Sequence, residues 1–353
     1  MTQITIGQLV DFLKLESDSF SHSDIVNVKF SDYSPYFCEA ISILKQNLNC
    51  VKLLTLDEGF NDYHLWYVSE LFNNLQYLRL NLPTSNRNNV ISDDGLFLLL
   101  SRLSKLEALI LSNIETVRFK RSFCALSSLQ NLTSLVLECI EISKKEFNVV
   151  LSEIGSKLER LTVSNIRALP DATYFLQIVF LLCTKLKFLL FNFVESKVED
   201  LVLFNIPTLA QLSLYLDKCV LNESSNKLVN VESLQLVLKN STDAQIAHFL
   251  SFCPAIKCLA LNATFTLEDS QQTLSALKNL IHLEKIEFLS CECLDTIIQI
   301  IISNPKCQIS LRQELDIENS LKFFDLIYAS EKSFEIVVEG SKSLDLPLPP
   351  NLK

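Results

Sequence analysis

Glycine is scarce in this sequence: five residues among 353, at positions 7, 59, 95, 155 and 340, with no cluster. A phosphate-binding loop needs several glycines within a few residues so that its backbone can approach the phosphate. Neither the GxGxxG nor the GxxxxGKS/T pattern occurs, and no Gly/Ser-rich stretch interrupts the chain. The scarcity of glycine therefore argues against a nucleotide-binding enzyme and against a flexible linker between separate domains.

Basic residues are also few. Lys and Arg number 31 against 41 Asp and Glu, which gives a formal net charge of −10 and a pI near 5.0. Nucleic-acid partners and anionic lipid surfaces usually require a basic face, so neither a nucleic acid nor a membrane is an expected partner.

Secretion signals and cysteine clusters are absent as well. The first twenty residues lack a basic segment followed by a long apolar one, so no signal peptide is predicted. The eleven cysteines are an odd number and are scattered along the chain, which is typical of reduced thiols in a cytoplasmic or nuclear protein.

Catalytic and metal-binding motifs are missing too. No HExxH occurs, and the spacing of His248, Cys253 and Cys258 matches no common zinc finger. Asp93 and Asp94 follow Ser92 directly, where they are expected to favour the start of a helix rather than to form a metal or acid–base site. The sequence therefore predicts no enzymatic activity, no metal and no cofactor.

One short phrase recurs along the chain: an apolar residue, two variable residues, leucine, one variable residue and an apolar residue. Successive clear copies begin 22 to 31 residues apart, a period typical of stacked units that bury a core only against their neighbours. The apolar fourth and sixth places alternate with other residues, as in a β-strand. Clear copies begin at Val51, Leu75, Leu106, Leu132, Leu158, Leu186, Leu209, Val231, Ile256 and Leu283, with weaker copies at Ile25 and around Ile309 and Ile336.

Helical runs separate the phrases, for example at 94–103, 145–154 and 244–252. Two of these runs begin with a capping box, Ser143 with Glu146 and Thr242 with Gln245. Each unit is expected to consist of one strand, a turn and one helix. The predicted fold is an α/β horseshoe-shaped solenoid with a parallel sheet on its concave face and helices outside.

Two apolar features have alternative interpretations. The stretch 172–194 is long enough to suggest a membrane span, but it contains Gln177, Lys185 and Lys187 and follows the repeat as helix, turn and strand. Trp66 lies in a helical run over 63–72, where packing of the helix is favoured over a ligand platform. Both features are therefore assigned to the repeat.

The predicted organisation is an N-terminal cap at 1–24, a solenoid of about twelve or thirteen repeats at 25–340 and a Pro-rich tail at 341–353. An unbroken repeat outweighs the length-based expectation of two or three domains, because a solenoid grows by addition.

The unit from Ser92 to Asn113 resembles the cysteine-containing class of leucine-rich repeats, typified by F-box leucine-rich proteins with a ribonuclease-inhibitor-like fold. The resemblance rests on the Ser-Asp-x-Gly-Leu turn at 92–96, the LxxLxLS phrase ending at Ser112 and Cys253-Pro254 before a strand. The chain differs in having no recognisable F-box before the first phrase and in placing Asn113, Cys139 and Asn165 one position early. The resemblance implies substrate selection within a ubiquitin ligase.

Strand alternation directs the third, fifth and seventh places of each phrase onto the concave face. The middle of this face is unusually apolar, and contiguous apolar surface with aromatic and arginine side chains is typical of protein interfaces. The predicted partner-binding residues are Tyr77, Arg79, Ile110, Val136, Arg160, Phe188, Leu190 and Tyr215.

Binding of protein partners by a monomeric, non-catalytic scaffold is the function that these patterns favour. One form of it is substrate recognition in a ubiquitin ligase. The alternative is a regulator or inhibitor that binds one protein without any link to ubiquitin.

Overall fold

The computed structural model describes residues 27–30, 51–57, 60–81, 91–114, 121–166, 171–263, 271–291 and 307–311. The chain divides into two compact units, each treated separately below. The N-terminal unit comprises Met1–Pro170 with Leu182–Leu186, and the C-terminal unit comprises Asp171–Leu181 with Lys187–Lys353. The predicted cap at 1–24 and the predicted tail at 341–353 lie outside the described residues.

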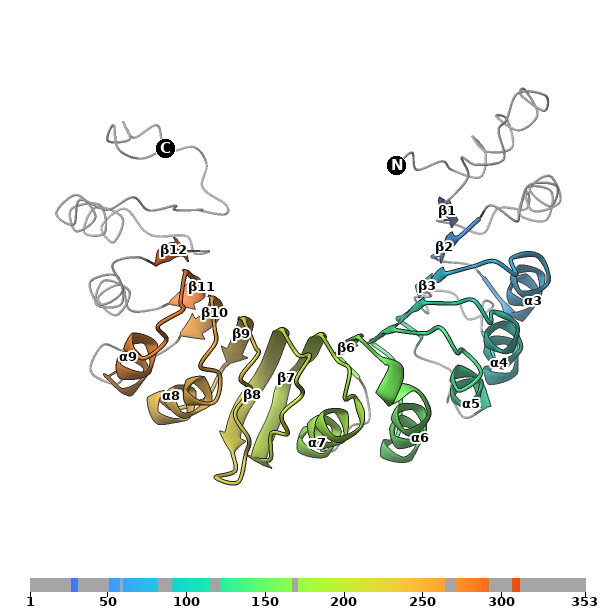
Figure 1. Cartoon of the computed structure of the whole chain (residues 1–353). Helices are drawn as coiled ribbons and strands as arrows, with labels where there is room; N and C mark the ends of the chain where they lie inside the picture. The colour runs from blue at the N-terminus through green and yellow to red at the C-terminus, as the bar shows by residue number, and fades with distance from the viewer. Residues whose placement is uncertain are drawn as a thin grey trace, which may run out of the picture. The chain divides into compact units, whose positions relative to one another are not determined.

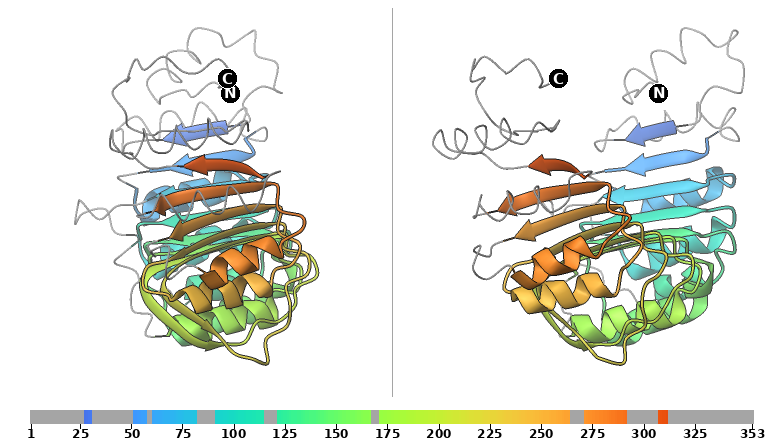
Figure 2. Two further views of the ribbon diagram at one scale, coloured as in Figure 1. Left: turned by 90° about the vertical axis from the view of Figure 1, so that its left-hand side faces the viewer. Right: turned by 60° about the vertical axis from the view of Figure 1, so that its left-hand side comes forward.

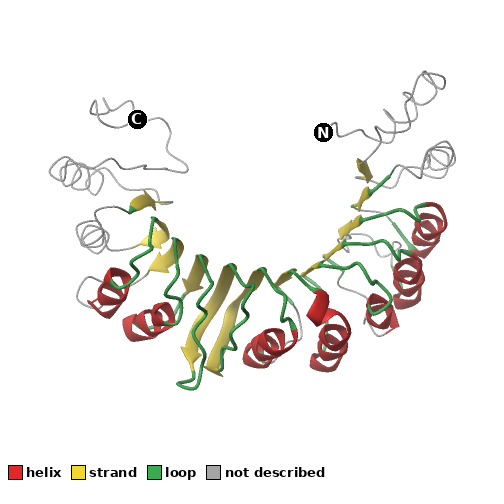
Figure 3. Ribbon diagram, in the orientation of Figure 1, coloured by secondary structure: helices red, strands yellow, loops and turns green. Residues whose placement is uncertain are grey.

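Parallel strands in sequence order form the sheet of the N-terminal unit (Figures 1 and 2), and each strand pairs with the next. Helices cover one side of this sheet (Figure 3). The strands are β1 (Asn27–Phe30), β2 (Leu53–Leu56), β3 (Tyr77–Asn81), β4 (Ala108–Ser112), β5 (Ser134–Glu138) and β6 (Arg160–Ser164). The helices are α3 (Asp62–Leu71), α4 (Asp93–Arg102), α5 (Arg121–Leu126) and α6 (Lys144–Ile154), followed by the short 3-10 turn η2 (Gly155–Lys157).

The same arrangement recurs in the C-terminal unit. Its strands are β7 (Phe188–Leu201), β8 (Gln211–Leu221), β9 (Ser233–Leu238), β10 (Cys258–Ala263), β11 (Lys285–Cys291) and β12 (Gln308–Leu311), again parallel and in sequence order. Its helices are α7 (Ala172–Leu182), α8 (Asp243–Ser251) and α9 (Gln271–Lys278). The last residue of α7, Leu182, is assigned to the N-terminal unit.

The repeat phrase accounts for the core. Its fourth and sixth places point toward the helices: Leu78 and Leu80 of β3, for example, are fully buried. The fourth places are in register across the strands, since Leu78 pairs with Leu109 and Leu109 with Leu135. Each repeat therefore adds one layer of leucines to a continuous core, as the strand pattern predicts.

Two short repeats depart from the predicted strand, turn and helix. The repeats from Leu186 to Leu209 and from Leu209 to Val231 span 23 and 22 residues, and no helix lies between β7 and β8 or between β8 and β9. Extended chain takes the place of the helix, because β7 and β8 continue to Leu201 and Leu221 and pair there through a shifted register. The expectation of one helix in every unit is wrong for these two repeats.

The stretch 172–194 folds as α7, a turn and the start of β7, which confirms its assignment to the repeat. Across the residues that the structure describes, no helix combines the length and hydropathy needed to span a bilayer.

The turns after three strands explain the early Asn and Cys positions. Asn113, Cys139 and Asn165 all have positive φ, at 57°, 49° and 51°. Asparagine tolerates this left-handed conformation because its short polar side chain can hydrogen-bond locally, whereas cysteine gains no such compensation. The left-handed backbone of the turn, rather than the family pattern, therefore determines which residue type suits the eighth place of these phrases.

Candidate binding surface

The candidate surface is the sheet face, defined here as the side of each unit's sheet opposite its helices. Third and fifth places of the clear copies of the phrase lie on this side and, apart from the buried Ser213 of β8, are at least partly exposed, while the fourth and sixth places are buried. The burial of β3 and β5 alternates in this way along the whole strand. The sheet face is therefore lined by side chains that the core does not need.

Five predicted binding residues share the sheet face of the N-terminal unit. Arg79, Ile110 and Val136 occupy one row of paired positions on β3, β4 and β5. Tyr77 and Arg160 lie in the neighbouring row, separated by Ala108 and Ser134. Adjacent strands lie about 4.8 Å apart, so each row is a continuous line of contacts for a bound chain. Arg160 is exposed and the other four are half-buried.

Arg79 carries a positive charge on this surface, and part of its guanidinium is buried. Its Nε atom is buried and has no hydrogen-bond partner. Burial raises the pKa of the Tyr77 hydroxyl on the same strand, and the positive charge of Arg79 opposes that rise. Tyr77 is therefore a neutral hydroxyl beside a guanidinium.

The other three predicted residues belong to the C-terminal unit. Phe188 and Leu190 occupy the third and fifth places of β7, and Tyr215 occupies the seventh place of β8. All three are half-buried. Asn192, which pairs with Tyr215, has a buried Oδ1 atom without a hydrogen-bond partner. The predicted residues thus form two groups, one in each unit.

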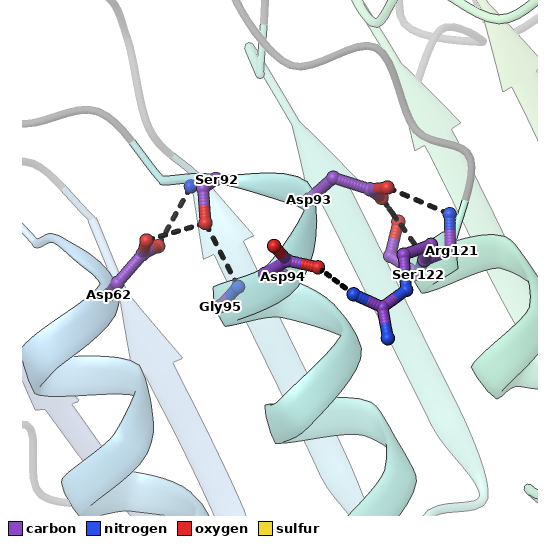
Figure 4. Close-up of polar contacts among 7 residues, drawn as sticks. All are labelled: Asp62, Ser92, Asp93, Asp94, Gly95, Arg121 and Ser122. Carbon is purple, nitrogen blue, oxygen red and sulfur yellow. Dashed lines mark hydrogen bonds and ion pairs between the residues drawn. The ribbon is translucent and has the colours of Figure 1, made fainter.

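Asp93 and Asp94 lie in the first turn of α4 behind the N-cap Ser92, as the sequence predicted, and both also have partners on the next helix. The Asp93 carboxylate accepts hydrogen bonds from the backbone N–H of Arg121 (2.7 Å) and from the N–H and hydroxyl of Ser122 (3.0 and 2.6 Å), at the start of the next helix (Figure 4). Asp94 pairs with the Arg121 guanidinium at 2.5 Å. The two neighbouring carboxylates therefore both hold α5 against α4.

The same contact recurs in other repeats, which the sequence patterns did not predict. Asp62, the first residue of α3, accepts from the N–H (2.7 Å) and hydroxyl (2.5 Å) of Ser92, the N-cap of α4. Asp243, the first residue of α8, accepts from the N–H groups of Gln272 and Thr273 in α9 at 2.7 and 2.8 Å. We call the three contacts made by Asp62, Asp93 and Asp243 the aspartate ladder. Its local signal is an N-cap residue followed directly by Asp.

Gly95 is part of this arrangement. A Cβ at Gly95 would collide with the carboxylate of Asp62. The glycine in the Ser-Asp-x-Gly-Leu turn thus lets the carboxylate of one helix reach the N-cap of the next (Figure 4).

The histidine and cysteines near residues 248–258 do not share an environment that could bind zinc. His248 is exposed on α8, Cys253 is buried and Cys258 is exposed on β10. Within the described ranges, no three metal-ligating side chains are grouped so that they could hold an ion. Burial raises the pKa of the Cys183, Cys219 and Cys253 thiols to about 12, so these thiols remain protonated and unreactive.

Trp66 does not pack into the core, although the sequence favoured a packing role for it. Its side chain is 41% exposed on α3. The indole lies beside two rings of its own helix: the Tyr63 ring at 6.5 Å and the Tyr67 ring at 5.0 Å between centroids. The side chain therefore belongs to an aromatic cluster on the outer surface of the helix rather than to the core.

No family model matches the sequence, and no curated protein matches it. Solved structures share its architecture. Rad7 in its complex with Elc1 from yeast is similar over 100% of this chain and 80% of its own, with 15% identity and a TM-score of 0.50. Two further structures have lower TM-scores. An internalin from Listeria monocytogenes is 14% identical over 88% of this chain and 95% of its own, with a TM-score of 0.44. The leucine-rich-repeat protein LegL7 from Legionella pneumophila is 12% identical over 89% of this chain and 91% of its own, with a TM-score of 0.38.

The chain has a leucine-rich-repeat fold. Its repeat phrase, its parallel strands in register and its likeness to Rad7 agree on this point. Identities this low establish the fold alone.

Proposed function

We propose that this protein is a non-catalytic scaffold that binds a protein partner on its sheet face. The observation that carries the proposal is an apolar face that no helix of the described residues covers. Parallel sheets are normally covered on both sides, but here helices lie on one side of each unit's sheet (Figure 3). The other side presents partly exposed Ile110, Val136, Phe188, Leu190 and Tyr215.

The outer surface of the helices provides a contrast. The exposed positions of α6, for example, include Lys144, Lys145 and Glu153, beside the apolar Val149. Apolar and aromatic side chains that are only partly covered by their own chain gain from burial against a second protein. On the sheet face such side chains adjoin across neighbouring strands, as Ile110 and Val136 do, and this contiguity favours association there.

The double variant Phe188→Ala/Tyr215→Ala tests this proposal. Aromatic anchors at protein interfaces contribute about 2 kcal/mol or more each, so binding of a captured partner should weaken by at least ten-fold in calorimetric titration. Lys145→Ala on α6 is the matched control and should bind normally. Full affinity in the double variant, together with loss in the control, would place binding on the outer surface and refute the proposal.

A ubiquitin-ligase setting is the more specific form of this function. Two observations favour it: the resemblance of the Ser92–Asn113 unit to F-box leucine-rich proteins and the likeness of the fold to Rad7, a protein whose structure was solved in complex with Elc1. Affinity purification from cells should then recover a cullin and its adaptor subunit with the chain. Recovery of one stoichiometric partner without either would favour the alternative, a regulator or inhibitor that binds one protein in the cytoplasm or nucleus.

A further inference from the structure

Arg79 is a charged side chain placed among neutral neighbours. On the sheet face of the N-terminal unit it pairs in register with Thr55 on β2 and Ile110 on β4. Tyr77 and Asn81 precede and follow it on the same face of β3. The side chain is half-buried, and its Nε atom is buried without a hydrogen-bond partner. None of the four neighbours offers a carboxylate.

Two other arginines of this unit have acidic partners. Arg102 pairs with Glu70, and Arg121 pairs with Asp94. For Arg79, the described residues provide neither an ion pair nor a hydrogen bond. Arginine is rarely withdrawn from water unless it is paired, because partial desolvation of an uncompensated charge is unfavourable. In the free protein the buried Nε–H of Arg79 is therefore shielded from water without a hydrogen bond to any described residue.

At the third and fifth places of the strands around Arg79, the charge has one sign. Third and fifth places on β2 to β6 include two arginines and no carboxylate. They are Leu53, Thr55, Tyr77, Arg79, Ala108, Ile110, Ser134, Val136, Arg160 and Thr162. The carboxylates of this face lie further along, at the seventh place: Asp57 beside β2, and Glu138 of β5, which accepts a hydrogen bond from the Ser112 hydroxyl at 3.2 Å. A chain of net charge −10 thus has a locally positive central strip.

We infer that Arg79 binds an oxyanion of the partner protein, namely the carboxylate of an Asp or Glu flanked by apolar residues. This inference rests on the proposed function and specifies the partner's chemistry. The planar guanidinium suits a carboxylate because it can donate two parallel hydrogen bonds. Tyr77 and Ile110, beside Arg79, provide the apolar contacts for the flanking residues.

Peptide selection tests the inference directly, because a random library samples carboxylates in many sequence contexts. Random dodecapeptides displayed on phage are selected on the immobilised full-length chain and, in parallel, on Arg79→Gln. We expect Asp or Glu next to apolar residues to be enriched by the wild type and not by Arg79→Gln. Arg102→Gln, on the outer surface of α4, is the matched control and should keep the enrichment.

Synthetic versions of the best peptide separate the possible sources of the oxyanion. Replacing its acidic residue by the amide should weaken binding about ten- to hundred-fold, the range for one charge-assisted hydrogen-bonded pair. The same replacement should have no further effect on Arg79→Gln. Arg79→Lys should recover part of the affinity, because it keeps the charge but loses the paired donors. A phosphoserine at that position that binds more tightly than Asp or Glu would show that phosphate is the preferred source and would overturn the carboxylate assignment.

Thermal stability distinguishes this role from a structural one. Arg79→Met keeps the length of the side chain but removes the uncompensated charge, so its melting temperature should equal or exceed that of the wild type. A clear fall would show that Arg79 supports the fold and would overturn the inference.

The same peptides separate the inference from the proposed function. If binding survives Arg79→Gln but is lost in Ile110→Asp, the sheet face binds protein and only the role of Arg79 is refuted. If neither variant changes binding while substitutions on α4 abolish it, the proposed function fails with the inference.

Discussion

Replacing Asp93 by Ala should destabilise the protein by weakening the contact between α4 and α5 of neighbouring repeats. The carboxylate accepts three hydrogen bonds from the first residues of α5, two from backbone N–H groups and one from the Ser122 hydroxyl. Ser122 is fully buried, so its hydroxyl would lose a partner that water does not readily replace. Loss of a helix cap costs about 1 kcal/mol and loss of a hydrogen bond to a charged group about 1.5–3 kcal/mol. Because these terms overlap, we expect a total of about 2–4 kcal/mol.

Asp94→Ala is a closely matched control. Asp94 follows Asp93 in the first turn of α4 and also reaches toward α5, but its partner is the Arg121 side chain, and the two side chains are 72% and 64% exposed. Exposed ion pairs contribute about 0–1 kcal/mol. Both variants remove one carboxylate from the start of the same helix, so the effect on the helix dipole largely cancels between them.

Urea denaturation followed by circular dichroism measures the difference. Asp93→Ala should lower the midpoint clearly, and Asp94→Ala should leave it close to that of the wild type. Asp93→Asn, which keeps one acceptor oxygen, should fall between them. Equal midpoints for Asp93→Ala and Asp94→Ala would mean that the carboxylate contributes only through the helix dipole, and the capping role would be refuted.

Three further substitutions test other parts of the fold, each by thermal or urea denaturation. Gly95→Ala should destabilise the protein by about 1 kcal/mol because the new methyl group displaces the Asp62 carboxylate, although alanine is the better helix former by about that amount. In an Asp62→Ala background the same change should be neutral or stabilising. An identical effect in both backgrounds would contradict this account. Cys139→Asn should raise stability by about 0.5 kcal/mol, since asparagine tolerates positive φ better than cysteine, and a decrease would mean that the thiol has a packing role. Leu135→Asp should cost several kcal/mol because it puts an unpaired charge at a fully buried position, and wild-type melting would show that the predicted repeat register is wrong.

The repeat phrase was sufficient to predict the strands because its signal is local. Alternation within six residues determines which side chains face the core, and β3, from Tyr77 to Asn81, accordingly begins at the third place of the phrase from Leu75. The capping boxes of Ser143 with Glu146 and Thr242 with Gln245 were predictable for the same reason and are confirmed. A third box, Asn61 with His64, was missed because histidine rarely fills the place of Glu or Gln.

Features that depend on distant residues were not predictable from the phrase. Asp62 and Ser92 are 30 residues apart, and no pattern inside one repeat reveals that the first carboxylate of a helix reaches the next one. The short repeats were visible in the spacing of Leu186, Leu209 and Val231, but the replacement of their helices by extended chain depends on how the neighbouring strands pair. The apolar residues of the sheet face were predicted by alternation, whereas the missing partner of Arg79 became apparent only when its neighbours on β2 and β4 were known.

The aspartate ladder has a direction, and that direction matches protein synthesis. In each contact the acceptor belongs to the earlier helix and the donors to the later one, as with Asp62 for Ser92 and Asp93 for Ser122. A ribosome completes the earlier helix first, so its carboxylate is already in place when the next helix emerges. The first turn is the costly step in forming a helix, and the waiting carboxylate binds amides in that turn. Each finished repeat thus offers the next one a fixed acceptor for the amides of its first turn.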